Sequence, residues 1–268
     1  MNRGRVSPIA VSPESGGSAV GRGGTMRAVI ALLAVLSLVF LAGCEDKTTG
    51  PGEAGGYPDI DGLIAFYGFD GNMQDETPGG NDATSGTVGL PFVKDHNGNE
   101  ARAIYVDGTS DSLWIPDHPD LRVTGSITLA AWIEPDGTAL AYNAVIDKNY
   151  DDAYSLGLHG VAPGDTLTDI RAFIGDVMFE FDDVVPVGVD EWTHIAFTFV
   201  DSSDVGRFYV NGDFVGSIVA ATTLGTSAAD VRLGSSLYGD AYAGAIDQVA
   251  IFDRALDETE VGLLYGFD

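Results

Sequence analysis

Basic residues are scarce in this chain of 268 residues, which carries 13 Lys and Arg against 40 Asp and Glu, for a formal net charge of −27. Recognition of nucleic-acid phosphates depends on clustered Lys and Arg. Docking on an anionic lipid surface by charge depends on the same residues. The composition therefore argues against nucleic acid as a partner and against membrane binding driven by charge.

Cysteine is also nearly absent, because Cys44 is the only one in the sequence. A single cysteine excludes an intrachain disulfide framework, a zinc cluster of thiolates and a redox CxxC pair. The four histidines show no HExxH spacing, and no GxSxG motif occurs. The sequence thus lacks the usual signals of a metalloprotease or a serine hydrolase.

The best enzymatic candidate is the segment Glu180-Phe181-Asp182-Asp183. Alternation along a strand places Glu180 and Asp182 on one face, and glycoside hydrolysis uses paired carboxylates. A third carboxylate on the same strand face would complete the pattern of laminarinase-like enzymes, but Val184 and Val185 stand at the next positions. We interpret this segment as a solvated acidic edge, and Asp147, Asp151 and Asp152 as loop charges. No catalytic residue is predicted.

The amino-terminal region reads as an export signal. Residues 1–25 are an upstream extension or a start assigned too early, and residues 26–43 have the pattern of a signal peptide. After Arg27, the uncharged stretch from Ala28 to Ala42 is too short to span a bilayer. The ending Leu41-Ala42-Gly43-Cys44 resembles a bacterial lipobox, which implies lipidation of Cys44. Residues 44–57 are rich in Gly, Thr and Pro, as in a flexible tether. We therefore expect an exported protein that is held in the bacterial cell envelope by a lipid anchor.

Residues 58–268 show the pattern of one all-β domain. Short runs of β-branched and aromatic residues alternate with Gly, Asn and Asp turns, and Asn211-Gly212 is a strong hairpin signal. Near the end, Asp257 and Glu260 have the spacing of a capping box, with Leu256 and Val261 placed as a hydrophobic staple. This pattern predicts a two-sheet antiparallel jelly-roll sandwich with one short carboxyl-terminal helix.

Four blocks of the domain carry a family resemblance. Residues 63–84, 102–135, 191–217 and 231–265 resemble, in order, the LamG-like jelly-roll domains of the concanavalin A-like lectin/glucanase superfamily. The resemblance implies a binding domain of that fold. The chain departs from the family's double histidine, because Thr193 stands between Trp192 and His194.

Acidic and amide side chains crowd the segment from Asp70 to Asp82, and carboxylate and carbonyl oxygens are the ligands of calcium. In LamG-like relatives this loop lies beside a strand near the carboxyl terminus, and a calcium ion there is common. The resemblance implies calcium ligands at Asp70, Asp75, Asp82 and Asp247, with a structural role. The alternative is ordinary turn chemistry, which uses the same residue types.

Sugar recognition favours aromatic rings beside a few polar groups. Alternation turns Trp114 away from its neighbours Leu113 and Ile115, and two loops carry aromatic and acidic residues together. The ligand-binding candidates are Trp114, Tyr142, Tyr150, Asp152, Tyr238 and Tyr242, although each of them could instead pack against a neighbouring loop.

The sequence as a whole predicts a non-catalytic, calcium-stabilised module that binds a glycan or a surface protein. Two alternatives stay open. One is a glycoside-active enzyme of the same superfamily, and the other is a structural or adhesion protein of the envelope without a soluble ligand.

Overall fold

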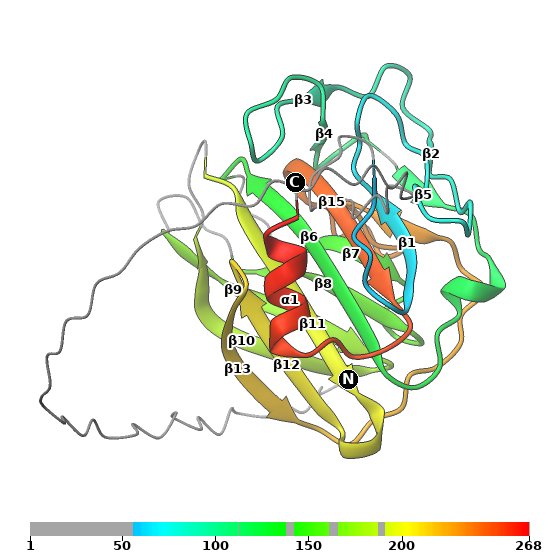
Figure 1. Ribbon diagram of the computed structural model, residues 1–268, viewed down its shortest axis with the longest axis vertical. Helices are drawn as coiled ribbons and strands as arrows, with labels where there is room; N and C mark the ends of the chain where they lie inside the picture. Colours follow the sequence, from blue (N-terminus) through cyan, green and yellow to red (C-terminus); the bar gives the residue numbers. More distant parts are fainter. Residues whose placement is uncertain (1–55, 112, 138–141, 161–165, 187–190, 268) are drawn as a thin grey trace, which may run out of the picture.

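The computed structural model describes residues 56–111, 113–137, 142–160, 166–186 and 191–267. The predicted extension, the signal peptide, Cys44 and nearly all of the tether lie outside these residues. Two antiparallel sheets form a sandwich, and one helix covers the outer face of one sheet (Figure 1). No helix of the described part is long and apolar enough to cross a membrane.

The eight-stranded sheet has the order β13-β12-β11-β6-β15-β4-β3, and β1 pairs with β15. Its strands are β1 (Leu63–Tyr67), β3 (Phe92–Val93), β4 (Ala103–Asp107), β6 (Ile127–Pro135), β11 (Thr193–Val200), β12 (Val205–Val210), β13 (Asp213–Val219) and β15 (Ala243–Phe252). Because β1 and β15 lie side by side, the two ends of the domain meet in this sheet.

The seven-stranded sheet has the order β10-β9-β8-β7-β14-β5-β2. Its strands are β2 (Thr84–Ser85), β5 (Leu113–Ile115), β7 (Tyr142–Lys148), β8 (Tyr154–His159), β9 (Leu167–Ile174), β10 (Val177–Pro186) and β14 (Val231–Leu233), and the short 3-10 turns are η1 (Pro119–Leu121) and η2 (Asp201–Ser203).

The core lies between the two sheets and is filled by alternate residues of their strands. Leu156 and Leu158 of β8 are fully buried in the same cluster as Ile127 and Leu129 of β6. Alternation with a period of two explains this packing, since it sends every second side chain of a strand inward. The predicted jelly-roll sandwich is therefore confirmed.

The predicted local signals also form. Asn211 and Gly212 adopt φ values of 52° and 79° in the turn between β12 and β13. Helix α1 (Glu258–Tyr265) begins with the expected capping box, in which the Asp257 carboxylate accepts from the Glu260 backbone N–H and the Glu260 side chain accepts from the Asp257 N–H. Leu256 and Val261 pack into one apolar cluster beneath the helix.

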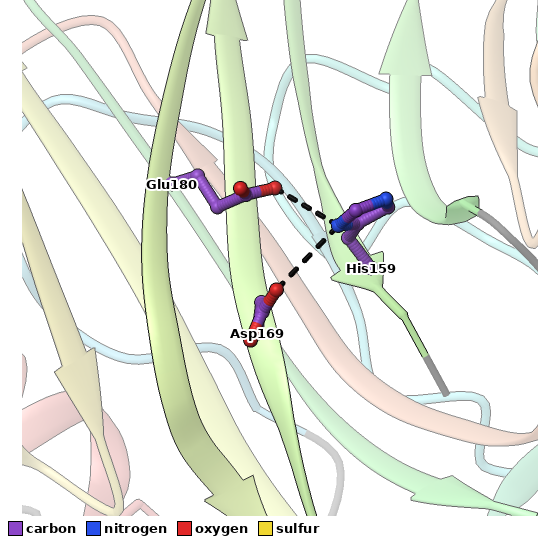
Figure 2. Close-up of side chains that lie close together, drawn as sticks. All are labelled: His159, Asp169 and Glu180. Carbon is purple, nitrogen blue, oxygen red and sulfur yellow. Dashed lines mark ion pairs between the residues drawn. The ribbon is translucent and has the colours of Figure 1, made fainter. Parts of the chain in front are cut away.

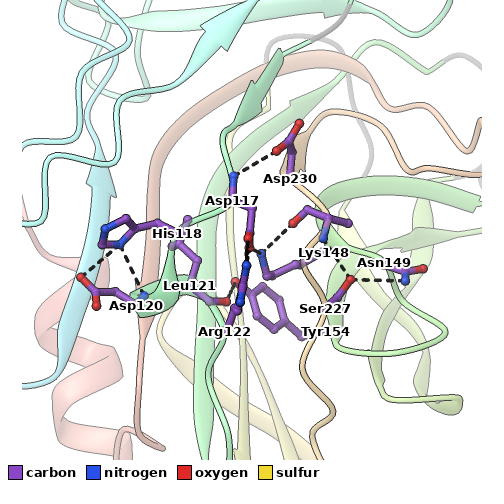
Figure 3. Close-up of polar contacts among 11 residues, drawn as sticks. Asp117, His118, Asp120, Leu121, Arg122, Lys148, Asn149, Tyr154, Ser227 and Asp230 are labelled. Carbon is purple, nitrogen blue, oxygen red and sulfur yellow. Dashed lines mark hydrogen bonds and ion pairs between the residues drawn. The ribbon is translucent and has the colours of Figure 1, made fainter.

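A buried ion pair joins the segments at one end of the seven-stranded sheet (Figure 3). Lys148 is fully buried, and its Nζ donates to Asp117 Oδ1 at 2.7 Å and to the Ala229 carbonyl at 2.7 Å. Arg122 donates to the same Asp117 carboxylate through Nε at 3.0 Å. These bonds fasten three segments that are distant in the sequence: the residues around η1, the end of β7 at Lys148 and the residues ahead of β14.

Candidate functional site

The outer face of the seven-stranded sheet carries a row of polar and aromatic side chains. The strand registers place Trp114 opposite Arg232, Arg232 opposite Asp147, and Asp147 opposite Ser155. The row continues through Phe173, which is opposite Ser155. Because directly opposed residues in an antiparallel sheet point to the same side, this face gathers residues from five adjacent strands.

Four aromatic rings on this face form what we call the tyrosine cluster: Tyr142, Tyr150, Phe173 and Tyr238. The rings of Tyr150 and Phe173 stack at 4.8 Å, and those of Tyr150 and Tyr238 also lie 4.8 Å apart. Tyr142 packs edge-on against both Tyr150 and Phe173. Tyr238 is 55% exposed, so the cluster presents one accessible ring above a packed base.

Beside the tyrosine cluster, three ionisable side chains converge from adjacent strands (Figure 2). We call His159, Asp169 and Glu180 the His159 cluster. His159 Nδ1 lies 3.0 Å from Glu180 Oε2 and 3.5 Å from Asp169 Oδ2. One ligand atom from each residue lies within 4.8 Å of the other two, and this is the single such group among the described residues.

Arg171 connects the two clusters. Its Nε donates to Glu180 Oε2 at 2.6 Å, and its Nη2 contacts the same oxygen. Its guanidinium carbon lies 5.5 Å from the centre of the Tyr142 ring, within cation–π range. Contacts with both the Glu180 carboxylate and the Tyr142 ring therefore hold the Arg171 side chain in place.

Asp147 lies at the centre of the row, in strand β7, and is fully buried. This corrects the interpretation of Asp147 as a loop charge. One carboxylate oxygen accepts from the Asn149 backbone N–H at 3.0 Å, and the other has no hydrogen-bond partner. Burial raises the pKa of this carboxyl to about 6.

Five of the six predicted ligand residues lie on or beside this face. Trp114 is half-buried on the outer side of β5, as predicted. Asp152 is exposed and accepts from Asn149 Nδ2 at 2.6 Å, while Asn149 Oδ1 accepts from the Tyr238 hydroxyl at 3.1 Å. The structure thus brings the two predicted loops together with Trp114 on one sheet.

The prediction for Tyr242 is wrong. Its side chain is 1% exposed, belongs to the main core cluster, and donates its hydroxyl hydrogen to the Ala245 carbonyl. The interpretation of Glu180 as part of a solvated edge is also wrong, since its residue is 8% exposed and ion-paired. Asp182, two positions on, is exposed.

The four aspartates predicted to bind calcium have separate partners. Asp75 braces its own loop, because its carboxylate accepts from the backbone N–H groups of Phe66, Thr77 and Asn81 at 2.9–3.1 Å. Asp82 accepts from the Asp75 N–H at 3.0 Å. These bonds are the turn chemistry that the sequence left open as the alternative.

Of the other two, Asp70 pairs with Arg102 at 3.3 Å, and Asp247 Oδ2 lies 2.8 Å from His96 Nδ1. No three of the four aspartates come together as a metal-holding group among the described residues. The arrangement therefore does not fit a calcium cage built from these four carboxylates, and calcium stays a prediction.

The outer face of the eight-stranded sheet holds a second polar group, which is closed to solvent. The His96 ring stacks on Trp132 at 4.3 Å, and Tyr265 of α1 lies 5.3 Å from Trp132. Burial lowers the pKa of the neighbouring His194 to about 3, so this ring is neutral. With Asp247 2% and His194 1% exposed, this group packs the sheet against its helix.

Arg171, His159, Asp169 and Phe173 are site residues that the sequence reasoning missed. A signal was available in LTDIRAFI, because Asp169, Arg171 and Phe173 alternate with Ile170 and Ala172. Charged and aromatic residues at alternate positions of a strand mark a face that is turned away from the core.

The two antiparallel sheets, with a polar and aromatic outer face on one of them, define a jelly-roll sandwich. A family model described as the concanavalin A-like lectin/glucanases superfamily matches residues 90–262. The chain therefore belongs to this superfamily. A search of curated proteins found no match.

Solved structures with this fold include sugar-bound domains. Domain 4 of AbnA, a GH43 extracellular arabinanase from Geobacillus stearothermophilus solved with arabinotriose, aligns with a TM-score of 0.60 at 21% identity, over 76% of this chain and 98% of that domain. The binding domain of Paraclostridial Mosquitocidal Protein 1 aligns with a TM-score of 0.61 at 15% identity, over 76% and 52%. The binding domain of Botulinum Neurotoxin DC in complex with SialylT aligns with a TM-score of 0.55 at 12% identity, over 77% and 51%. This chain covers about half of each toxin domain, and these identities show the fold alone.

Proposed function

We propose that this chain is a non-catalytic carbohydrate-binding module and that its binding site is the outer face of the seven-stranded sheet. One observation carries the proposal: the exposed Tyr238 ring stands on the packed tyrosine cluster, next to charged groups on the same face. A sugar ring has apolar C–H faces and hydroxyl edges, so aromatic rings and a few oriented polar groups suit it together.

The charges on this face favour an uncharged glycan. Arg171 is already paired with Glu180, and Arg232 lies opposite Asp147 in the sheet, so each arginine of the face has a carboxylate near it. Asp152 and Asp169 add further negative charge on or beside the face. An anionic sugar would meet these two carboxylates, and like charges brought together cost binding free energy. Neutral oligosaccharides, such as pentose or hexose polymers, are therefore the expected ligands.

The lipid anchor at Cys44 and the flexible tether complete the proposal. An acylated Cys44 would hold the domain at the membrane while residues 45–57 let it reach outward. The module would then be displayed on the bacterial envelope, where it would meet glycans or glycosylated surface proteins.

The test is isothermal titration of the chain with neutral oligosaccharides, including arabino-, xylo- and gluco-oligomers, and with a sialylated glycan for comparison. Tyr238→Ala removes the exposed ring and should weaken binding of the neutral ligand roughly threefold to tenfold, since an aromatic contact contributes about 0.5–1.5 kcal/mol. Phe214→Ala is the matched control, because Phe214 is 42% exposed but lies on β13 of the other sheet.

Two results would overturn the proposal. Absence of saturable binding across the panel would leave a structural envelope protein. Turnover of an oligosaccharide that is abolished by Glu180→Gln would instead make this face a glycosidase site.

A further inference from the structure

We infer that the His159 cluster is a binding site for a divalent transition-metal ion of the zinc class. The inference is independent of the proposed glycan site, because it depends on the ligand atoms of His159, Asp169 and Glu180 alone.

The strand registers bring the three ligands together. His159 of β8 is directly opposite Asp169 of β9, and Glu180 of β10 is opposite Arg171, two positions beyond Asp169 on the same face. All three side chains therefore leave the same side of the sheet from three hydrogen-bonded strands. Ligands on adjacent strands are held in fixed relative positions, which suits a site that needs defined distances.

The distances fit shared coordination. Zinc–nitrogen and zinc–oxygen bonds are about 2.0–2.2 Å long, so ligand atoms 3.0–3.5 Å apart, as found around His159 Nδ1, can bind the same ion. His159 Nδ1 is buried and makes no hydrogen bond, although Glu180 Oε2 lies within reach. A buried nitrogen without a hydrogen bond is costly, and coordination to a cation would satisfy it.

The donor set selects the kind of metal. One imidazole nitrogen with two carboxylate oxygens suits zinc and its neighbours in the first transition row. Calcium takes six to eight oxygen ligands, so the cluster differs in chemistry from the calcium site predicted around Asp70 and Asp247.

Neighbouring groups fix the two acidic ligands. The Asp183 backbone N–H donates to Asp169 Oδ1 at 3.0 Å, which leaves Oδ2 directed to the cluster. Arg171 holds Glu180. Hydrogen bonds of this kind orient metal-binding carboxylates, but the positive charge of Arg171 also opposes a cation. We therefore expect weaker binding than in a closed structural zinc site.

The site lies near the surface of the domain. The side chains of His159 and Asp169 are 29% and 19% exposed, while that of Glu180 is 6% exposed. His159 Nδ1 itself is buried, so these exposures belong to other atoms of the side chains. Zinc sites with three protein ligands usually complete their coordination with a water or an exogenous ligand in the fourth place.

The experiment is a titration of the full chain, without a histidine tag and in a Cys44→Ser background, so that neither a tag nor the lone thiol binds metal. After EDTA treatment and dialysis, Zn²⁺ is followed by calorimetry and Co²⁺ by its visible absorption. We expect one equivalent of Zn²⁺ and a loss of affinity of more than roughly tenfold in His159→Ala. His118→Ala is the matched control, since His118 also lies beside an aspartate, 3.3 Å from Asp120, but outside the cluster.

Asp169→Asn provides a second variant that preserves shape, because an amide oxygen still accepts from Asp183. It should also lose Zn²⁺ affinity while its circular dichroism stays that of the parent chain. Imidazole NMR signals give an independent measurement: Zn²⁺ should shift those of His159 and leave those of His118 unchanged. Failure to bind Zn²⁺, or equal binding by parent, His159→Ala and Asp169→Asn, would overturn the inference and leave an ion-pair network.

Discussion

Replacing Lys148 by methionine tests what the buried ion pair contributes to stability. The substitution keeps a long, unbranched side chain but removes the ammonium group that Asp117 and the Ala229 carbonyl share. Breaking a buried ion pair typically costs about 3–5 kcal/mol. Asp117 is 12% exposed and keeps Arg122 as a partner, so the cost should fall near about 3 kcal/mol, at the lower end of that range.

Thermal and urea-induced unfolding measure this loss directly. For a domain of this size, about 1 kcal/mol shifts Tm by roughly 2–4 °C, so Lys148→Met should lower Tm by roughly 6–12 °C. Arg122→Met is the control, because Arg122 contacts the same carboxylate with a side chain that is 42% exposed. An exposed ion pair contributes little, and the Tm of this variant should stay close to that of the parent.

An unchanged or higher Tm for Lys148→Met would refute the reasoning. It would mean that the free energy cost of burying the ammonium group is larger than the free energy gained from its contacts with Asp117 and the Ala229 carbonyl. A double-mutant cycle with Asp117→Asn distinguishes the two effects, because only the direct interaction appears as non-additivity.

Three further predictions follow from the local chemistry. Because the four aspartates predicted to bind calcium have separate partners, millimolar calcium added after EDTA should leave Tm unchanged; a rise of several degrees that is smaller in Asp82→Asn would instead support the predicted calcium site. Asp257→Ala removes the helix cap and should cost about 1 kcal/mol, measured by urea unfolding, whereas Asp257→Asn should cost less. Two carboxyls should shape the pH profile of stability. Hydrogen bonds from Arg122 and from the buried Lys148 lower the pKa of Asp117 to about 2, so the contribution of this carboxylate is present above the ordinary pKa of about 4 and is lost as pH falls toward 2. Burial raises the pKa of Asp147 to about 6, so its contribution is full below about pH 4 and is lost as pH rises through 6. Asp147→Asn should flatten the profile between about pH 4 and 6, and an unaltered profile would show that Asp147 does not titrate there.

The parts of the fold that the sequence predicts correctly depend on neighbouring residues. The turn at Asn211-Gly212 needs two residues that tolerate positive φ, and the cap of α1 needs an acceptor and a glutamate three positions apart. The outward position of Trp114 likewise follows from its direct neighbours Leu113 and Ile115, which point to the opposite face of the strand. Each of these features is specified within a few positions of the chain, so each could be predicted without knowledge of the fold.

The candidate site depends on which strands become neighbours, and the sequence does not show that. Trp114 and Asp147 reach one row only because Arg232 of β14 lies between them. Tyr238 and Tyr242 stand four positions apart in one glycine-rich segment, yet one is 55% and the other 1% exposed. The start of β15 decides that difference, since Tyr242 directly precedes Ala243 and turns into the core.

The two outer faces of the sandwich differ in a way that points to the seven-stranded sheet as the binding face. On the eight-stranded sheet, α1 buries an apolar cluster, and Tyr265 and His96 both stack on Trp132, so the polar groups there face protein. On the seven-stranded sheet, the tyrosine cluster carries the exposed Tyr238, and the side chains of Asp169 and His159 beside it are 19% and 29% exposed. Buried polar atoms without hydrogen bonds occur on both sheets, at Asp147 on one and at Trp132 and His194 on the other, so they do not distinguish the two faces. What distinguishes them is access: a ligand can cover an exposed ring and partly exposed charged groups without displacing protein, whereas α1 already covers the polar groups of the other sheet. That asymmetry is the physical reason for placing both the glycan and the metal on the seven-stranded sheet.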